Sequence, residues 1–152
     1  MSRRLIAAFL AVVLSAAGAA AAAATHSEGG PPYQAENARL ARATPSYPRA
    51  RLLVDEPIWG EAGSSAFEAV QRIYRLGRPT TQKRILAFYK RRLGRSWRPK
   101  GKACLVAGRR AVVAFLYVRR RRLGVVIDSR GATYCGEHVA NIAQLLQLGY
   151  PD

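Results

Sequence analysis

Three apolar segments in the second half of the chain, joined by short arginine-containing connections, restrict the fold more than any other feature. They span residues 103–107, 111–118 and 123–128, and β-branched or other apolar residues dominate each of them. Such short connections join strands that are antiparallel neighbours, because a parallel pair needs a crossover of a dozen or more residues. The sequence therefore predicts an antiparallel meander. Its middle strand is apolar on both alternations, which indicates that both of its faces are covered.

The segment before the meander has the pattern of an amphipathic helix. Over residues 80–93 the apolar residues recur at helical spacing and form one broad face. A threonine at the start suits the N-cap, and Gly94 suits the position just after the helix. Basic residues fill the last turns, where they oppose the negative end of the helix dipole. A second, shorter helix is expected over residues 138–148, where apolar residues again have helical spacing.

Residues 66–76 fit two different structures. Their apolar residues recur at helical spacing, and Ser65 with Glu68 would form a capping box at the start of a helix. Several of the same residues are β-branched or aromatic and also suit a strand. Periodicity does not decide between these alternatives in so short a segment. Residues 51–54 are expected to form a short strand.

Several short motifs over residues 47–131 resemble a group of uncharacterised secreted bacterial proteins. In chain order the motifs are Tyr47-Pro48-x-Ala50, Tyr74-Arg75-Leu76, Thr80-Thr81, Ile85-Leu86-Ala87-Phe88-Tyr89-x-x-x-Leu93 and Trp97. In that group a leader and a Pro-rich tether precede a small domain with this entry, this helix, a Trp-containing strand and a sheet. The resemblance implies that residues 66–76 form a strand leading into the helix. It implies no activity.

The N-terminus predicts export. Arg3 and Arg4 precede an uncharged apolar run, and residues 15–24 are almost all alanine, which offers small residues to a signal peptidase. We expect cleavage near Ala24, so that residues 1–24 are a signal peptide. The alternative is an uncleaved N-terminal anchor, because the apolar and alanine-rich parts together are long enough to cross a bilayer as a helix.

The rest of the chain divides into a tether and one domain. Residues 25–48 lack periodicity and contain several Pro and Gly residues, so they are expected to form a flexible tether with a transient helical turn around residues 35–43. Residues 49–152 are expected to form a single α+β domain. We predict an antiparallel sheet of about four to five strands, one long helix packed on a face and a short C-terminal helix.

The two cysteines of the chain, Cys104 and Cys135, allow two interpretations. An even number of cysteines in an exported chain predicts one disulfide bond. A free Cys135 close to His138 would instead be a candidate thiol nucleophile. No metal site or cofactor is expected, since zinc needs three or four ligands and this stretch offers two or three.

The charge of the chain indicates an anionic partner. Lys and Arg number 25 against 9 acidic residues, a net charge of +16, and 21 of the 25 basic residues are arginine. Arginine stays charged at any workable pH and forms bidentate pairs with phosphate and carboxylate groups. We therefore expect an acidic cell-envelope polymer or a lipid surface as partner, ahead of nucleic acid. The oligomeric state is not predicted. The candidate anion-binding residues lie on two expected hairpin connections and are Arg109, Arg110, Arg119, Arg120, Arg121 and Arg122.

The leading hypothesis for function is a non-enzymatic extracytoplasmic binding or accessory module with a basic surface. The alternative is a small secreted hydrolase. It would use the acidic residues Asp55, Glu56 and Glu61, because paired carboxylates can perform glycosidic hydrolysis, or the stretch from Cys135 to His138. The sequence contains no Gly-rich phosphate loop, no G-x-S-x-G motif and no H-E-x-x-H motif. The arginine runs themselves have a simpler alternative as solvated turns in an arginine-rich chain.

Overall fold

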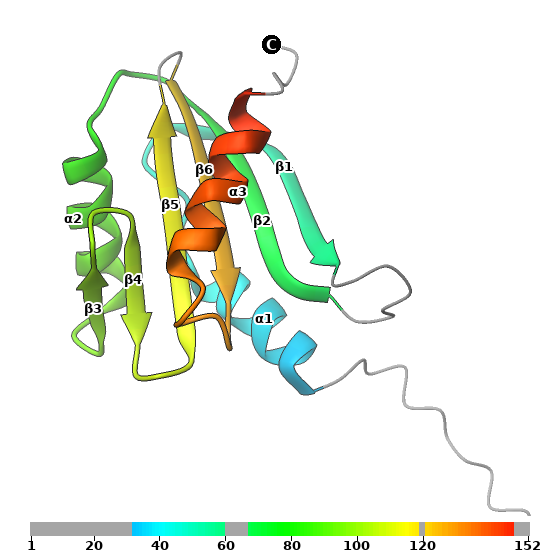
Figure 1. The fold of residues 1–152 in the computed structure, drawn as a ribbon. Helices are drawn as coiled ribbons and strands as arrows, with labels where there is room; N and C mark the ends of the chain where they lie inside the picture. Colours follow the sequence, from blue (N-terminus) through cyan, green and yellow to red (C-terminus); the bar gives the residue numbers. More distant parts are fainter. Residues whose placement is uncertain (1–31, 60–66, 119–120, 148–152) are drawn as a thin grey trace, which may run out of the picture.

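The computed structural model describes residues 32–59, 67–118 and 121–147 (Figure 1). Within these residues six strands form one antiparallel sheet in the order β1-β2-β6-β5-β4-β3, and three helices pack against it. The elements are α1 (Pro32–Ala43), β1 (Ala50–Trp59), β2 (Phe67–Leu76), α2 (Gln82–Leu93), β3 (Trp97–Lys100), β4 (Cys104–Ala107), β5 (Ala111–Val118), β6 (Arg122–Asp128) and α3 (Cys135–Gln147).

The predicted α+β class with an antiparallel sheet is confirmed, but the expected numbers of elements are not. The sheet of the described residues has six strands rather than four to five. The C-terminal helix is not short, because α3 has 13 residues and α2 has 12. A third helix, α1, precedes the sheet. The expected strand at residues 51–54 belongs to a longer one, since β1 has 10 residues.

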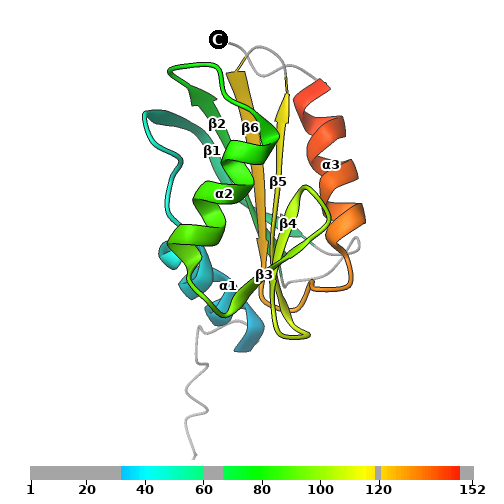
Figure 2. The same cartoon turned by 90° about the vertical axis from the view of Figure 1, so that its left-hand side faces the viewer.

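The predicted meander is confirmed, and its middle strand is covered on both faces. β5 pairs with β4 on one side and β6 on the other. Val113 and Phe115 of β5 pack in the cluster that contains the buried residues of α2, whereas Val112 and Ala114 pack with Ile142 of α3. Figure 2 shows the result, with α2 and α3 on opposite sides of the sheet.

Residues 67–76 form a strand, as the resemblance implied, and the capping-box alternative is wrong. The strand β2 pairs with β1 and β6, so its backbone groups take part in the sheet on both sides. Ile73 and Tyr74 are both fully buried although they face opposite sides of the sheet. A helix would bury one stripe only, and the burial of both alternations therefore explains the apolar pattern of this segment.

Residues 32–48 differ from the expected flexible tether. The helix α1 lies on the same side of the sheet as α2 (Figure 2), and Ala41 is buried with a relative exposure of 4%. Arg72 Nη1 donates hydrogen bonds to the carbonyl oxygens of Ala41 and Thr44 at 2.7 and 3.2 Å. Asn37 Oδ1 accepts a hydrogen bond from the Ser129 backbone N–H at 2.6 Å. These contacts come from distant parts of the chain and hold a segment that has no strong helical pattern of its own.

Residues 1–31 lie outside the described part of the structure, and the predicted signal peptide, its cleavage site and the first part of the expected tether fall within them. Among the helices of the described ranges, none is long and apolar enough to cross a membrane.

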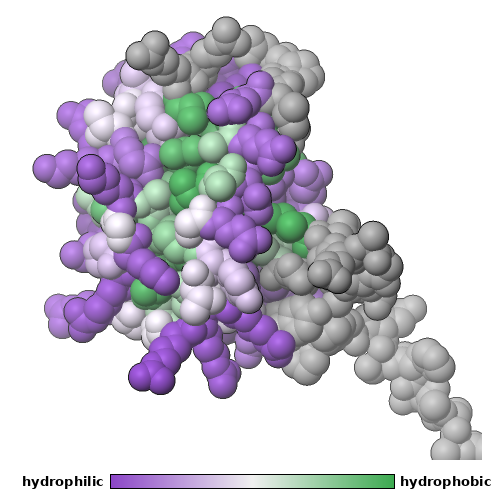
Figure 3. All heavy atoms as spheres, in the orientation of Figure 1, coloured by the Kyte–Doolittle hydropathy of each residue, from purple (hydrophilic) through white to green (hydrophobic). Residues whose placement is uncertain are grey.

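The helix α3 packs closely against β6 and forms one side of the molecule. Gly124 makes this approach possible, because a Cβ atom at this position would overlap Cγ2 of Ile142. Figure 3 shows this side of the molecule, on which apolar residues form a strip over α3 and β5 between hydrophilic side chains. The half-buried Leu116 and Val139 contribute to the apolar cluster beneath it.

Candidate anion-binding groove

The sharp turn at the end of α2 brings basic residues of the helix next to the edge strand β3. Lys90, Arg91 and Arg92 occupy the last turn of α2 and are exposed. Gly94, the predicted stop, has a φ of 96°, a conformation that favours glycine. The chain then enters β3 at Trp97, which pairs with Ala107 of β4 and is 8% exposed. The buried indole fixes the position of β3 beside the helix.

A groove of about 620 Å³ lies between α2 and β3, and we call it the β3 groove. Its apolar lining comes from Ala87, Trp97 and Pro99. Four of its lining residues are cations, and none is a carboxylate; the full lining is Ala87, Lys90, Arg91, Gly94, Arg95, Trp97, Arg98 and Pro99.

A second hollow of about 430 Å³ shares Trp97 as part of its wall, and we call it the α1 hollow. It lies where α1, the end of α2 and the strands β4 and β5 meet. Three cations and one carboxylate line it, together with apolar residues; the full lining is Glu36, Arg39, Leu40, Ala43, Arg92, Leu93, Trp97, Ala107, Arg110, Ala111 and Ser129.

The cations of the β3 groove have no acidic partner in the described ranges. Ion pairs within these ranges include those of Arg72 with Asp55 and of His138 with Asp128, at 3.2 and 3.0 Å, and none of them involves a cation of the groove. Like charges that gather without a carboxylate repel one another and attract anions. The C-terminal end of the α2 helix dipole carries about half a negative charge, so it offsets only a small part of the positive charge of these side chains. The positive charge of the groove exceeds that amount.

The predicted anion-binding residues lie at opposite ends of the sheet. Arg109 and Arg110 are exposed in the turn between β4 and β5, and Arg110 lines the α1 hollow. Arg121 is exposed near the connection of β5 and β6, and its Nη1 donates a hydrogen bond to the Gly77 carbonyl at 3.2 Å. Arg119 and Arg120 lie outside the described residues.

One of these residues is not on a hairpin tip as expected. Arg122 is the first residue of β6, half-buried, and lies opposite Arg75 in β2 and Val118 in β5. The expected four-residue connection is therefore shorter, because the sheet pairing of β6 begins one residue earlier than the apolar run indicates.

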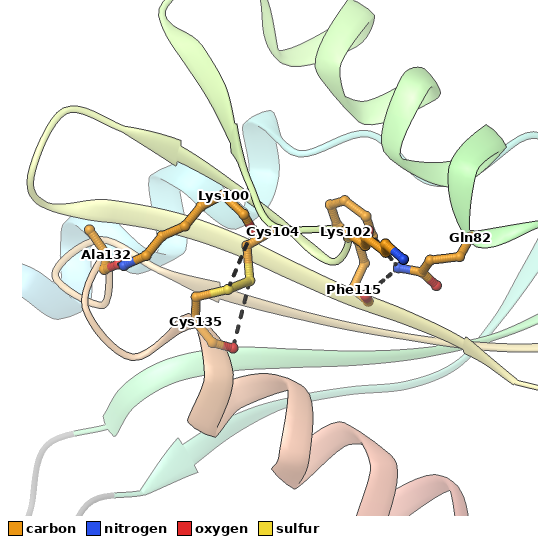
Figure 4. The surroundings of a disulfide bond; sticks show 7 residues. All are labelled: Gln82, Lys100, Lys102, Cys104, Phe115, Ala132 and Cys135. Carbon is orange, nitrogen blue, oxygen red and sulfur yellow. Dashed lines mark hydrogen bonds between the residues drawn. A yellow bond between two sulfur atoms is a disulfide. The ribbon is translucent and has the colours of Figure 1, made fainter.

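Cys104 and Cys135 form a disulfide bond, as predicted. The S–S distance is 2.04 Å and the Cα atoms are 6.1 Å apart. The bond joins β4 to the first residue of α3, and Lys100 Nζ donates a hydrogen bond to the Ala132 carbonyl close by at 2.7 Å (Figure 4). Cys135 therefore has no free thiol, and its role as a nucleophile is ruled out in this state of the protein.

His138 has a partner that the sequence did not indicate. Its Nε2 atom lies 3.0 Å from Oδ2 of Asp128, the last residue of β6. Oδ1 of the same carboxylate accepts a hydrogen bond from the Arg130 backbone N–H at 2.7 Å. Asp128 thus ties α3 to the turn that precedes it, and neither residue lines one of the two hollows.

The acidic residues proposed for hydrolysis are not brought together. Asp55 and Glu56 are consecutive in β1, so their side chains point to opposite faces of the sheet. Asp55 pairs with Arg72, and Glu56 Oε1 accepts a hydrogen bond from Gln71 Nε2 at 3.2 Å. Glu61 lies outside the described residues. Two carboxylates on opposite faces cannot flank one glycosidic bond.

The residues of the β3 groove were missed by sequence reasoning, although a signal was present. From the sequence alone, the basic residues at the end of α2 are explained by the helix dipole. Their spacing around Trp97, with Arg95 before it and Arg98 directly after it, was the available indication of a basic surface beside an aromatic residue.

A function for this protein follows neither from a metal site nor from similarity to known proteins. In the part of the chain that the structure describes, no group of three His, Cys, Asp or Glu side chains is placed to hold a metal ion. Comparison of the chain with protein-family models, with curated proteins and with solved structures finds no match. The function must therefore be inferred from the site itself.

Proposed function

We propose that the protein is a non-enzymatic extracytoplasmic binding module whose β3 groove holds anionic groups of its partner. The observation that carries this proposal is the convergence of four cations on one groove without a lining carboxylate: Lys90, Arg91, Arg95 and Arg98. Arginine binds phosphate and carboxylate groups through two parallel hydrogen bonds, which favours an anion over a neutral ligand.

The disulfide and the predicted leader support a location outside the cytoplasm. Disulfides persist in oxidising compartments and are rare in the cytosol. The Cys104–Cys135 bond fits that location, as does the resemblance to secreted bacterial proteins. We infer from this location that the partner is an anionic polymer of the cell envelope or a lipid surface. The arginines of the two hairpin connections are further candidate contacts for such a partner.

The alternative function, a small secreted hydrolase, has no support from a specific arrangement in the described residues. Its thiol candidate is oxidised, and Asp55 and Glu56 face away from each other. The lining of the β3 groove contains no Asp, Glu, His, Cys, Ser or Thr, the residues that most often act as acid, base or nucleophile.

The proposal is tested by two triple variants that change the net charge equally. The first, Arg91→Gln, Arg95→Gln and Arg98→Gln, removes charge from the β3 groove. The matched control, Arg78→Gln, Lys83→Gln and Arg84→Gln, removes the same charge from exposed residues that line neither hollow. Binding to long-chain polyphosphate is measured at several salt concentrations, and thermal unfolding is followed for all three proteins.

We expect the groove variant alone to lose most of its affinity. Each lost phosphate contact should lower the slope of log K against log salt by about 0.7, so the slope should fall by about 2. The control should bind nearly as the parent does, and both should unfold near the parent temperature, because exposed charges contribute little to stability. Equal losses in both variants would mean that net charge and not the groove governs binding, and the proposal would be rejected.

A further inference from the structure

The two consecutive residues Arg91 and Arg92 line different hollows. Successive residues of a helix are about 100° apart around its axis. Arg91 accordingly lines the β3 groove and Arg92 the α1 hollow, with Trp97 forming part of the wall of both. The last turn of α2, visible beside α1 and β3 in Figure 2, therefore presents positive charge on both sides of one aromatic side chain.

The α1 hollow continues the positive surface, with one interruption. Arg39, Arg92 and Arg110 line it from three different elements or turns, and Glu36 is its one lining carboxylate. Within the described ranges Glu36 forms no ion pair with these arginines. Both hollows thus attract anions, and the attraction is weaker in the second.

We propose that the partner is a linear phosphate polymer without aromatic bases, which runs from the β3 groove past Trp97 into the α1 hollow. This inference rests on the proposed function and names its ligand class. A compact anion would neutralise one hollow and leave the cations of the other unpaired. A chain with regularly repeated charges neutralises both, and linking the two contacts raises its affinity over that of either alone.

The lining residues disfavour a nucleic acid. Single-stranded nucleic acids bind through exposed aromatic rings on which bases stack. Trp97 is the aromatic residue that lines both hollows, and at 8% exposure it leaves little surface on which a base could stack. Ala87 and Pro99 offer small apolar surface to the alkyl carbons of a polyol phosphate. Charge and small apolar contacts, without a stacking surface, favour a phosphate chain that has no bases.

Two probes and two pairs of substitutions test this inference. The probes are tripolyphosphate, which can occupy one hollow, and long-chain polyphosphate, which can reach both. One variant, Arg91→Gln with Arg95→Gln, alters the β3 groove, and the other, Arg39→Gln with Arg92→Gln, alters the α1 hollow. A third variant, Glu36→Gln, removes the carboxylate from the α1 hollow without altering the β3 groove.

We expect the groove pair to weaken binding of both probes and the hollow pair to weaken binding of the long chain only. For the hollow pair the slope of log K against log salt should fall by about 1.4, which near 0.1 M salt corresponds to roughly a tenfold or greater loss of affinity. Glu36→Gln should strengthen binding of the long chain several-fold and leave tripolyphosphate binding unchanged. A merely structural role of Glu36 would not produce such a gain.

Failure of this inference can be told from failure of the proposed function. If the groove pair weakens both probes while the hollow pair and Glu36→Gln change neither, the groove binds an anion but no chain crosses Trp97, and the inference is overturned. If the groove pair has no effect, the proposed function fails. Single-stranded DNA of equal charge should bind more weakly than long-chain polyphosphate at the same salt concentration; equal or tighter binding would overturn the exclusion of bases.

Discussion

Removal of the Cys104–Cys135 disulfide should lower the free energy of unfolding by about the amount that the crosslink contributes by restricting the unfolded chain. The two cysteines are 31 residues apart. For a loop of this length the chain-entropy relation gives about 3.7 kcal/mol at 25 °C. With about 2.1 cal/mol/K of unfolding entropy per residue over a domain of roughly 110 residues, the melting temperature should fall by about 16 °C.

The variant for this measurement is Cys104→Ala with Cys135→Ala. Alanine is preferable to serine because Cys104 is fully buried, and a hydroxyl there would add the cost of an unpaired polar group. Urea unfolding followed by circular dichroism gives both the free energy and its dependence on urea. That dependence should increase, because the unfolded chain without the crosslink exposes more surface. The wild-type protein under reducing conditions is the matched comparison.

The result that would refute this reasoning is specific. A loss below about 1 kcal/mol with an unchanged urea dependence would show that the bond does not restrict the unfolded chain as the loop length requires. An equal loss in reduced wild type and in the alanine variant supports the entropic account, whereas a much larger loss in the alanine variant alone would point to the packing of the sulfur atoms.

Three further predictions concern the core and the surface. Gly124→Ala should cost about 1–3 kcal/mol, because the new Cβ overlaps Ile142, whereas Gly136→Ala, with open space around it, should be neutral or stabilising; urea unfolding checks both. Tyr89→Phe should leave stability unchanged or raise it by up to about 3 kcal/mol, since the buried hydroxyl has no hydrogen-bond partner in the described ranges. Burial raises the pKa of Tyr89 well above its usual range, whereas in the unfolded chain this hydroxyl deprotonates near pH 10. Deprotonation therefore favours the unfolded state, and as the pH rises above about 10 the free energy of unfolding should fall in wild type by an amount that is absent in the variant. Replacing residues 119–121 with serine should leave the melting temperature nearly unchanged and flatten the salt dependence of retention on anionic vesicles.

The elements that could be predicted from the sequence are those whose local pattern agrees with their final environment. The meander and α2 fall in this group, because each apolar residue faces a neighbouring layer at the spacing that its own element requires. The helix α1 was predicted only as a transient helical turn, since the hydrogen bonds of Arg72 and Ser129 that hold it come from β2 and from the residue after β6. Such contacts have no local signature.

The candidate site was missed for a related reason. The basic residues of α2 are visible in the sequence, but their convergence with Arg95 and Arg98 depends on the turn at Gly94 and on the pairing of Trp97 with Ala107. The arginines of residues 119–122, by contrast, are consecutive in the sequence and form a visible cluster there. Proximity in the sequence and proximity in space coincide at a hairpin tip, and they do not coincide where a helix end meets an edge strand.

The arginine excess of this chain has two physically different components, and they can be separated. The side chain of Arg72 is 13% exposed and binds Asp55 and two carbonyl oxygens, so its replacement should destabilise the fold. Arg91 and Arg95 are exposed and have no acidic partner in the described ranges, so their replacement should leave the fold intact. If the excess reflected composition alone, loss of binding would be spread evenly over all exposed cations. A loss confined to the residues around Trp97, without a change in stability, requires that those positions hold positive charge for a partner.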